Sequence, residues 1–260
     1  MPRSRAAASV AAALLVLLAI GQLYRESTQR PLVLDVHDRT AVFPQTILWA
    51  WERPENLSFI DPRDVGVAFL AKTLRVRSEQ VEVRPRLQPL LVPPETFLIA
   101  VARIETPLAR TEPITPVQHG RLVSEITEMT RLQNIRAVQV DFDARASQRD
   151  WYRTLLTDVR RTLPDSMALS ITALASWCWY DDWLDRMPVD EAVPMLFRMG
   201  PDGSRIRQLL TSGRDSSAAL CRTSVGISTD EPMPKMPSRR RRYVFHPTSW
   251  TEDALRAIAE

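Results

Sequence analysis

The chain has 260 residues, of which 45% are hydrophobic and 25% charged, an ordinary globular composition that counts against disorder, collagen-like repeats and coiled coil. Its 34 basic and 31 acidic residues give a formal net charge of +3, too balanced to indicate a nucleic-acid-binding protein. Glycine-rich phosphate loops, the H-E-x-x-H zinc motif and the G-x-S-x-G nucleophile motif are absent from the sequence, and its three histidines lie far apart, so we expect neither a cofactor nor a metal.

The first 24 residues have the features of an export segment. Arg3 and Arg5 precede a predominantly apolar stretch at residues 6–20, which is short for a membrane span but typical of a signal peptide. Ala19 and Gly21 would occupy the −3 and −1 positions of a cleavage site before Gln22. Cleaved signal peptide and uncleaved membrane anchor stay open. In either case we expect residues 25–260 to form a single domain outside the cytoplasm, periplasmic or on the outer face of the inner membrane.

Short apolar runs rich in Val, Ile, Phe and Thr predict eight strands. They lie at residues 47–51, 65–70, 97–104, 137–142, 168–174, 191–198, 224–229 and 243–246. Helical spacing of apolar residues predicts helices at 117–132, 151–163, 178–187, 204–210 and 251–258. For the second helix, Ser147 is the expected N-cap and Pro164 the expected stop.

Strands that alternate with helices predict parallel pairing and right-handed crossovers. Eight strands favour an α/β fold of the (β/α)8 TIM-like type, irregular or incomplete, and a doubly wound open sheet is the alternative. The irregularity is expected between strands 2 and 3, where Leu74 and Val76 and then Val81 and Val83 alternate around residues 78–79 and predict a hairpin insertion.

Several predicted strands have one apolar and one polar face. In the fourth strand, Gln139, Asp141 and Asp143 alternate with apolar residues, and in the third strand Arg103 and Glu105 share a face. The apolar face must meet the helices, so the polar faces point into the barrel. Ligand sites of such barrels lie at the carboxyl ends of the strands. The sequence therefore predicts a ligand site there, with a purely structural polar network as the alternative.

The candidate catalytic residues are the carboxylates Asp143, Asp141 and Glu105, because glycoside hydrolysis needs one protonated and one ionised carboxyl group. The strand rise puts Asp141 and Asp143 about 6.6 Å apart along the chain. The candidate substrate-binding residues lie on the polar strand faces or at and beyond the expected strand ends. They are Arg103, Gln139, Trp177, Glu52, Arg198, Asp230 and His246. Trp177 is expected at the mouth of the barrel, where an indole ring could stack on a sugar, whereas Trp179 and Trp183 also fit a helix core.

Five segments resemble a bacterial family known only as a domain of unknown function. They are V-Q-V-D-F-D-A at 138–144, L-S-I-T-A-L-A-S-W-C at 169–178, V-D-E-A-V-P-M-L-F-R-M-G at 189–200, W-A-W-E-R-P at 49–54 and V-A-R-I-E at 101–105. This resemblance implies no known activity.

A more distant similarity is to chitinase-like glycoside hydrolase barrels. There the fourth strand ends in acidic residues at alternate positions, the last of which is the acid, and this similarity implies that role for Asp143. The chain departs from the pattern at Gln139, which replaces an acidic residue. It departs again at Phe197 and Arg198, which stand where those barrels have Tyr and Asp.

These features favour an exported barrel that binds a polysaccharide or oligosaccharide, with hydrolysis of that ligand as an open possibility. A non-catalytic envelope protein with a degenerate glycosidase-like barrel is the alternative, and a small-molecule esterase or lyase is a third reading. We expect no nucleic-acid partner and no membrane contact except through the N-terminal segment.

The same strand assignment predicts whether the two cysteines can form a disulfide. Cys178 follows the fifth strand, at the expected mouth, and Cys221 precedes the seventh, at the expected floor. A strand of about six residues separates these levels by roughly 20 Å, whereas disulfide Cα atoms lie within about 7 Å. We therefore expect two free thiols, although export would favour a disulfide.

Overall fold

The computed structural model describes residues 38–107, 112–233, 235 and 239–258, and its compact unit begins at Arg39. The predicted export segment, residues 1–24, lies outside the described residues. In the part of the chain that is described, no helix has both the length and the apolar character needed to cross a membrane.

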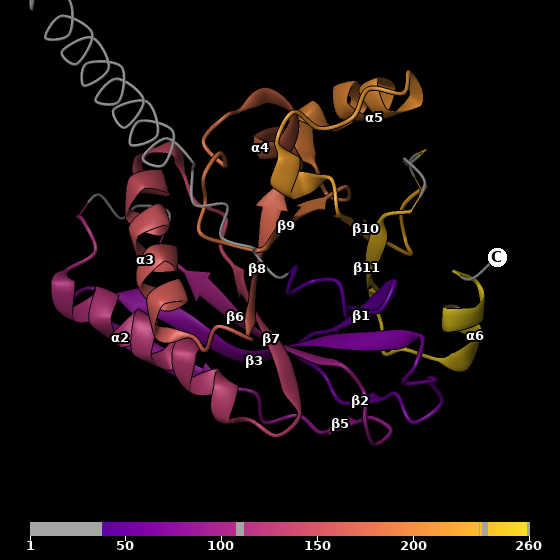
Figure 1. Ribbon diagram of the computed structural model, residues 1–260, viewed down its shortest axis with the longest axis horizontal. Coiled ribbons are helices and arrows are strands. Elements are labelled where there is room, and N and C mark those ends of the chain that lie inside the picture. Colours follow the sequence, from indigo (N-terminus) through magenta and orange to yellow (C-terminus); the bar gives the residue numbers. More distant parts are fainter. Residues whose placement is uncertain (1–37, 108–111, 234, 236–238, 259–260) are drawn as a thin grey trace, which may run out of the picture. The chain divides into compact units, whose positions relative to one another are not determined.

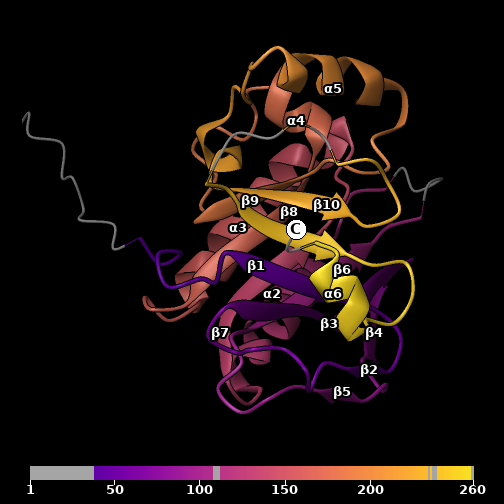
Figure 2. The ribbon, with the colours of Figure 1, turned by 90° about the vertical axis from the view of Figure 1, so that its right-hand side faces the viewer.

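Eight parallel strands close into a barrel. Hydrogen-bonded neighbours follow the order β1, β11, β10, β9, β8, β7, β6 and β3, and β3 pairs back to β1. Figure 2 shows β11 between β1 and β10. The strands are β1 (Thr46–Ala50), β3 (Val65–Arg77), β6 (Leu98–Glu105), β7 (Ile135–Asp141), β8 (Ala168–Leu174), β9 (Glu191–Met195), β10 (Ser224–Ser228) and β11 (Arg241–Phe245). The (β/α)8 TIM-like prediction is confirmed, and closure between β1 and β3 excludes the open sheet.

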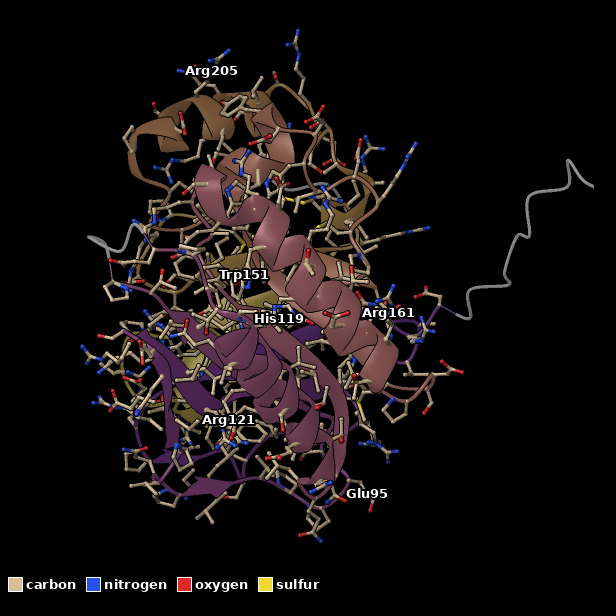
Figure 3. All side chains as sticks on the ribbon, turned by 90° about the vertical axis from the view of Figure 1, so that its left-hand side faces the viewer. Glu95, His119, Arg121, Trp151, Arg161 and Arg205 are labelled. Carbon is tan, nitrogen blue, oxygen red and sulfur yellow. A yellow bond between two sulfur atoms is a disulfide. The ribbon has the colours of Figure 1, made fainter. Side chains whose placement is uncertain are left out.

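Helices cover the outside of the ring after β6, β7, β8, β9 and β11. They are α2 (Pro116–Glu128), α3 (Arg149–Thr162), α4 (Ala175–Tyr180), α5 (Gly203–Thr211) and α6 (Glu252–Arg256). The helices α2 and α3 lie side by side against the sheet (Figure 1). Figure 3 shows His119 of α2 beside Trp151 of α3, and their rings meet edge to face with centroids 6.3 Å apart.

Short single-turn helices flank these elements. They are η1 (Met129–Arg131), η2 (Ala146–Gln148), η3 (Gly200–Asp202) and η4 (Ala219–Cys221). Ser147 lies inside η2, so its predicted role as the N-cap of α3 is wrong, and Gln148 holds that position.

The predicted helix at 178–187 is also wrong. The helix α4 begins at Ala175 and ends before Asp181, which is extended and forms an ion pair with Arg149 at 2.5 Å. Trp183 then packs edge to face on Trp177, with ring centroids 4.8 Å apart. The ion pair with Arg149 of α3 and the contact between the two tryptophans are thus found where the sequence predicts a continuing helix.

The barrel is irregular where the sequence predicts it. The strand β3 continues past the ring and pairs antiparallel with β4 (Gln80–Pro85), with Leu74 opposite Val83 and Val76 opposite Val81. This is the predicted hairpin insertion. No described helix connects β1 to β3 or β10 to β11, and the first of these connections contains β2 (Glu55–Asn56), which pairs with β5 (Leu90–Leu91).

Two apolar cores lie on opposite sides of the strands. The outer core packs strand residues such as Val138, Val140 and Phe142 against the helices. The smaller inner core includes Ile47, Trp49, Ile99, Val101 and Tyr243. The predicted face alternation is confirmed, because Val138 and Val140 lie outside whereas Gln139 between them bonds Trp49 inside the barrel.

The expectation of two free thiols is wrong, since Cys178 and Cys221 form a disulfide with Cα atoms 6.0 Å apart. The flanking strands β8 and β10 lie at the residues that the sequence predicts. The error therefore concerns the position of the two strands relative to each other along the barrel axis. Met195 of β9 is level with Leu174 at the end of β8 and also with Gly226 in the middle of β10. This stagger raises β10 towards the mouth. The segment before η4 then reaches α4, where the Ser217 amide donates to the Cys178 carbonyl.

Candidate functional site

A cavity of about 490 Å³ opens at the carboxyl ends of the barrel strands, on the side that the sequence predicts. Its polar wall comes from β6, β7, β8 and the segments that follow β1 and β9. Its lining consists of Trp49, Trp51, Glu52, Arg103, Asp141, Asp143, Thr172, Leu174, Ala175, Ser176, Met195, Phe197, Arg198, Met199 and Phe245.

Asp141 is the most enclosed carboxylate of the cavity. Its Oδ1 accepts a hydrogen bond of 2.7 Å from the Thr172 hydroxyl, and its Oδ2 lies 3.9 Å from Nε of Arg103. Burial raises the pKa of the Asp141 carboxyl, the Thr172 hydrogen bond opposes that shift, and the neighbouring charge of Asp143 adds to it. The carboxyl group is therefore poised to hold a proton more readily than a solvated aspartate.

Asp143 stands at the rim of the same cavity. It lies two residues after the end of β7, and a turn in which the Ala144 amide donates to the Phe142 carbonyl fixes its backbone. Partial burial raises the pKa of the Asp143 carboxyl, while the positive charge of Arg103 opposes the shift. The two carboxyl groups thus differ in exposure and share one cation.

Aromatic side chains form the opposite wall. Phe197 and Phe245 stack with ring centroids 5.8 Å apart and planes 6° apart. The guanidinium of Arg198 lies 5.2 Å from the centre of the Phe245 ring, and that of Arg103 lies 5.9 Å from Trp51. Arg198 has a φ of 50°, a left-handed backbone conformation uncommon for a residue with a side chain. The cavity therefore offers flat apolar surface facing charged groups.

A fully buried polar network forms the floor of the cavity. Trp49 Nε1 donates to Gln139 Oε1 at 3.0 Å, and Gln139 Nε2 donates to the Ser170 hydroxyl at 3.1 Å. Ser170 in turn donates to Glu191 at 3.2 Å. Glu191 also accepts from the Tyr243 hydroxyl at 2.7 Å and forms an ion pair with Arg241. Polar groups thus continue from the cavity to the amino-terminal end of the barrel.

Among the predicted site residues, this cavity collects Asp141, Asp143, Arg103, Glu52 and Arg198. Gln139 lies beneath it instead, with no exposed surface and both amide atoms bonded, so it does not line the cavity.

The Glu105 carboxylate forms ion pairs with two arginines. Its Oε2 accepts from Arg75 Nε at 2.6 Å, and its Oε1 lies 3.5 Å from Arg103 Nε. Arg75 comes from the hairpin insertion, and the sequence gives no sign that it reaches Glu105. The expected second catalytic carboxylate therefore lies outside the cavity that holds Asp141 and Asp143.

Trp177 does not lie at the mouth. It is 3% exposed and belongs to the outer core, where it meets Trp183. The chain turns into α4 directly after β8, so Trp177 leaves the barrel axis and its predicted position is wrong.

Asp230 and His246 lie beside the cavity without lining it. Asp230 accepts from the Ser228 hydroxyl, which lowers the pKa of its carboxyl group. His246 bonds the hydroxyl groups of Thr229 and Thr248 and packs against Trp250, with ring centroids 4.9 Å apart. Both side chains support the rim.

Sequence reasoning missed Glu191 and Phe245. Glu191 shares an inward face with Val193 and Met195 at the start of β9, so strand alternation could have found it. Phe245 ends β11 inside a short apolar run, where nothing marks it as a cavity residue. No group of three or more His, Cys, Asp or Glu residues in the described part of the chain is arranged to hold a metal ion.

Fold and cavity together define a TIM-like barrel with a carboxylate-containing mouth. Residues 95–188 match the family described as a domain of unknown function, DUF3142. This match confirms the expected resemblance to such a family.

The chain is also similar to the spore cortex-lytic enzyme SleL of Bacillus cereus, a crystal structure, with 13% sequence identity and a TM-score of 0.45. The similarity covers 71% of this chain, which spans about half the length of SleL, 51%. No curated protein matches the chain.

Proposed function

We propose that the protein binds a polysaccharide or oligosaccharide in the cavity at the barrel mouth. The observation that carries this proposal is the occurrence of Asp141 and Asp143 in one cavity with Trp51, Phe197 and Phe245. Aromatic rings stack on the apolar faces of sugars, and carboxylates accept hydrogen bonds from sugar hydroxyl groups. A volume of about 490 Å³ lies in the range of small-ligand sites.

Hydrolysis of a glycosidic bond is the second candidate function, because Asp141 and Asp143 line one cavity and burial raises the pKa of the Asp143 carboxyl, which suits an acid. In this mechanism one carboxyl group protonates the leaving oxygen and an ionised carboxylate supports the developing positive charge or activates water. Asp143, which a leaving group can reach at the rim, is the proposed acid. Asp141 is the proposed partner, because the Thr172 hydrogen bond and the charge of Arg103 favour its ionised form against the effect of burial. The occupation of Glu105 by Arg75 and Arg103 favours the alternative, a non-catalytic envelope protein with a degenerate barrel.

The binding proposal is tested by a glycan array on residues 25–260, followed by calorimetry on the glycans that bind. Trp51→Ala removes a half-buried cavity ring and is expected to weaken binding by about 1 to 3 kcal/mol. Trp177→Phe, a change in the outer core, is the control and should leave affinity unchanged. Equal effects of both substitutions, or no glycan bound, would exclude the cavity as a sugar site.

The hydrolysis proposal is tested on the same glycans by release of reducing ends. Asp143→Asn should abolish turnover while the protein stays folded by circular dichroism, because the amide is nearly isosteric with the carboxyl group. A wild-type protein that binds the glycan but releases no product would leave binding as the sole function.

We also propose that the protein is exported. A disulfide is stable in the periplasm and outside the cell but rare in the cytoplasm, and Cys178–Cys221 therefore supports this proposal. Cell fractionation with thiol alkylation before lysis tests it. Recovery of the full-length chain in the cytoplasmic fraction with both thiols alkylated would contradict export.

A further inference from the structure

A second cavity, of about 560 Å³, lies between the hairpin insertion and the barrel mouth. Residues of β3 and β4, the segment 86–88 after the hairpin and Glu105 at the end of β6 line it. Glu52 lines both this cavity and the one that holds Asp141 and Asp143. The two cavities are therefore neighbours.

An ion pair marks the boundary between the two cavities. Arg103 lines the first cavity, Glu105 lines the second, and Arg103 Nε lies 3.5 Å from Glu105 Oε1. Both side chains are partly exposed, with 39% and 29% of their surface accessible. A ligand that extends beyond the first cavity on this side would pass over this pair and Glu52.

Strand alternation gives the second cavity its chemistry. Leu74 and Val76 of β3 are buried in the outer core, so Thr73 and Arg75, at the alternate positions, lie on the opposite face of the hairpin. Arg84 is directly opposite Thr73 in the strand register. The hairpin thus places two arginines in the lining of the cavity.

Arg75 and Arg84 each use only the Nε donor in hydrogen bonds to described residues, so their other N–H groups can bind a ligand. Arg75 donates through Nε to Glu105 at 2.6 Å, and Arg84 donates through Nε to Glu82 at 2.6 Å. A guanidinium group carries five N–H donors in a planar fork that fits a carboxylate. Arg86 differs, because it donates to the carbonyl groups of Trp51 and Arg53 and so holds the cavity wall.

We propose that the second cavity is a subsite for an acidic sugar and that the ligand is an anionic glycan chain spanning both cavities. This inference rests on the proposed carbohydrate binding and adds the class of ligand. A sugar unit in the first cavity meets the carboxylates and aromatic rings, and a carboxylate-bearing unit in the second meets Arg75 and Arg84. The ligand is proposed to be a chain because the Arg103–Glu105 ion pair lies between the two cavities.

Calorimetry with sugar oligomers of defined length tests the inference. The acidic probes are the dimer and hexamer of galacturonic acid and the hexamer of hyaluronan, and the neutral probe is the hexamer of cellulose. The variant is Arg84→Gln. Arg77→Gln is the matched control, because Arg77 has the same partner, Glu82, and similar side-chain exposure, 55% against 53%, but does not line the cavity.

At least one acidic hexamer should bind more tightly than the acidic dimer and the neutral hexamer. Loss of a charge-assisted hydrogen bond in Arg84→Gln should weaken that hexamer about tenfold and leave the neutral hexamer unchanged, while Arg77→Gln should bind like the wild type.

Binding of the neutral hexamer as tightly as the acidic ones would overturn the inference and leave carbohydrate binding in place. Equal weakening by both substitutions would also overturn it, because it would indicate a general effect of charge. Failure of every oligomer to bind would overturn the inference, and the proposed function falls with it only when the glycan array is blank as well.

Discussion

Two inward carboxylates of the barrel, Glu191 and Asp141, show how neighbours decide the state of a buried charge. Glu191 receives hydrogen bonds from Tyr243 and Ser170 and is paired with Arg241, so both of its oxygen atoms are compensated. Asp141 has a single close hydrogen bond from Thr172 and a cation 3.9 Å away. Glu191 is thus compensated at both oxygen atoms, whereas Asp141 has fewer close partners.

Asp141→Asn is expected to stabilise the protein at neutral pH. A raised pKa in the folded state means that the folded protein holds this proton more tightly than the unfolded chain does. The carboxyl group therefore favours folding below its ordinary pKa of 3.8 and loses that contribution as pH rises through the raised value. Urea unfolding at pH 3.5 and pH 7.5 should show a gain from the substitution only at the higher pH. A loss of stability at pH 7.5 would mean that the ion pair with Arg103 outweighs burial.

Glu191→Gln is expected to destabilise the protein by about 3 to 5 kcal/mol, because it leaves the charge of Arg241 buried without a counter-charge. Glu252→Gln is the control, since the Glu252–Arg256 pair is exposed and should contribute less than about 1 kcal/mol. Urea unfolding of both variants measures the difference. Equal costs would show that the floor network does not hold the barrel together.

At the scale of elements, two irregular segments shape the mouth. The hairpin of β3 and β4 supplies Arg75, which pairs with Glu105 and forms a wall of the second cavity. The short helix α4 turns Trp177 into the outer core and brings Cys178 to Cys221. The hairpin interrupts the strand-helix alternation of the fold, whereas α4 keeps it with a helix of only 6 residues.

The disulfide is expected to stabilise the connection between α4 and η4. Cys178 and Cys221 are 43 residues apart, and closing a loop of that length in the unfolded chain corresponds to about 3 to 4 kcal/mol. The double variant Cys178→Ala/Cys221→Ala should lose this stability in thermal or urea unfolding.

Two controls accompany that measurement. A reducing agent should lower the stability of the wild type but not of the double variant. Alkylation of the denatured, unreduced wild type should add no mass, and two added alkyl groups would contradict the disulfide.

At the scale of the whole molecule, Trp49 joins strands from around the barrel. Its ring lies 5.4 Å from Tyr243 and 6.1 Å from Phe197, and its Nε1 bonds Gln139. A Cβ atom on Gly226 would approach the Trp49 ring to 2.8 Å, so glycine is required there. The ring thus contacts residues from four parts of the barrel.

Trp49→Ala is expected to cost about 3 to 5 kcal/mol of stability, the usual cost of removing a large buried aromatic ring. Trp51→Ala, two residues further along the chain but at the half-exposed rim, should cost much less and act on ligand affinity. Chemical unfolding of the two variants separates these roles. Similar losses in stability would place Trp51 in the core as well.

The sequence by itself determined the eight strands, the hairpin and the direction of most polar side chains. Alternation in a strand is a local property of the backbone, so Val138 and Val140 had to face away from Gln139 and Asp141. For the same reason Asp141, Asp143 and Arg103 could be assigned to one end of the barrel, and the cavity contains all three.

Only the tertiary structure decided which groups meet. The stagger between β8 and β10 brought Cys178 to Cys221, and the hairpin carried Arg75 to Glu105. Strand heights and distant partners depend on hydrogen bonding between strands far apart in the sequence, and no local pattern encodes that register.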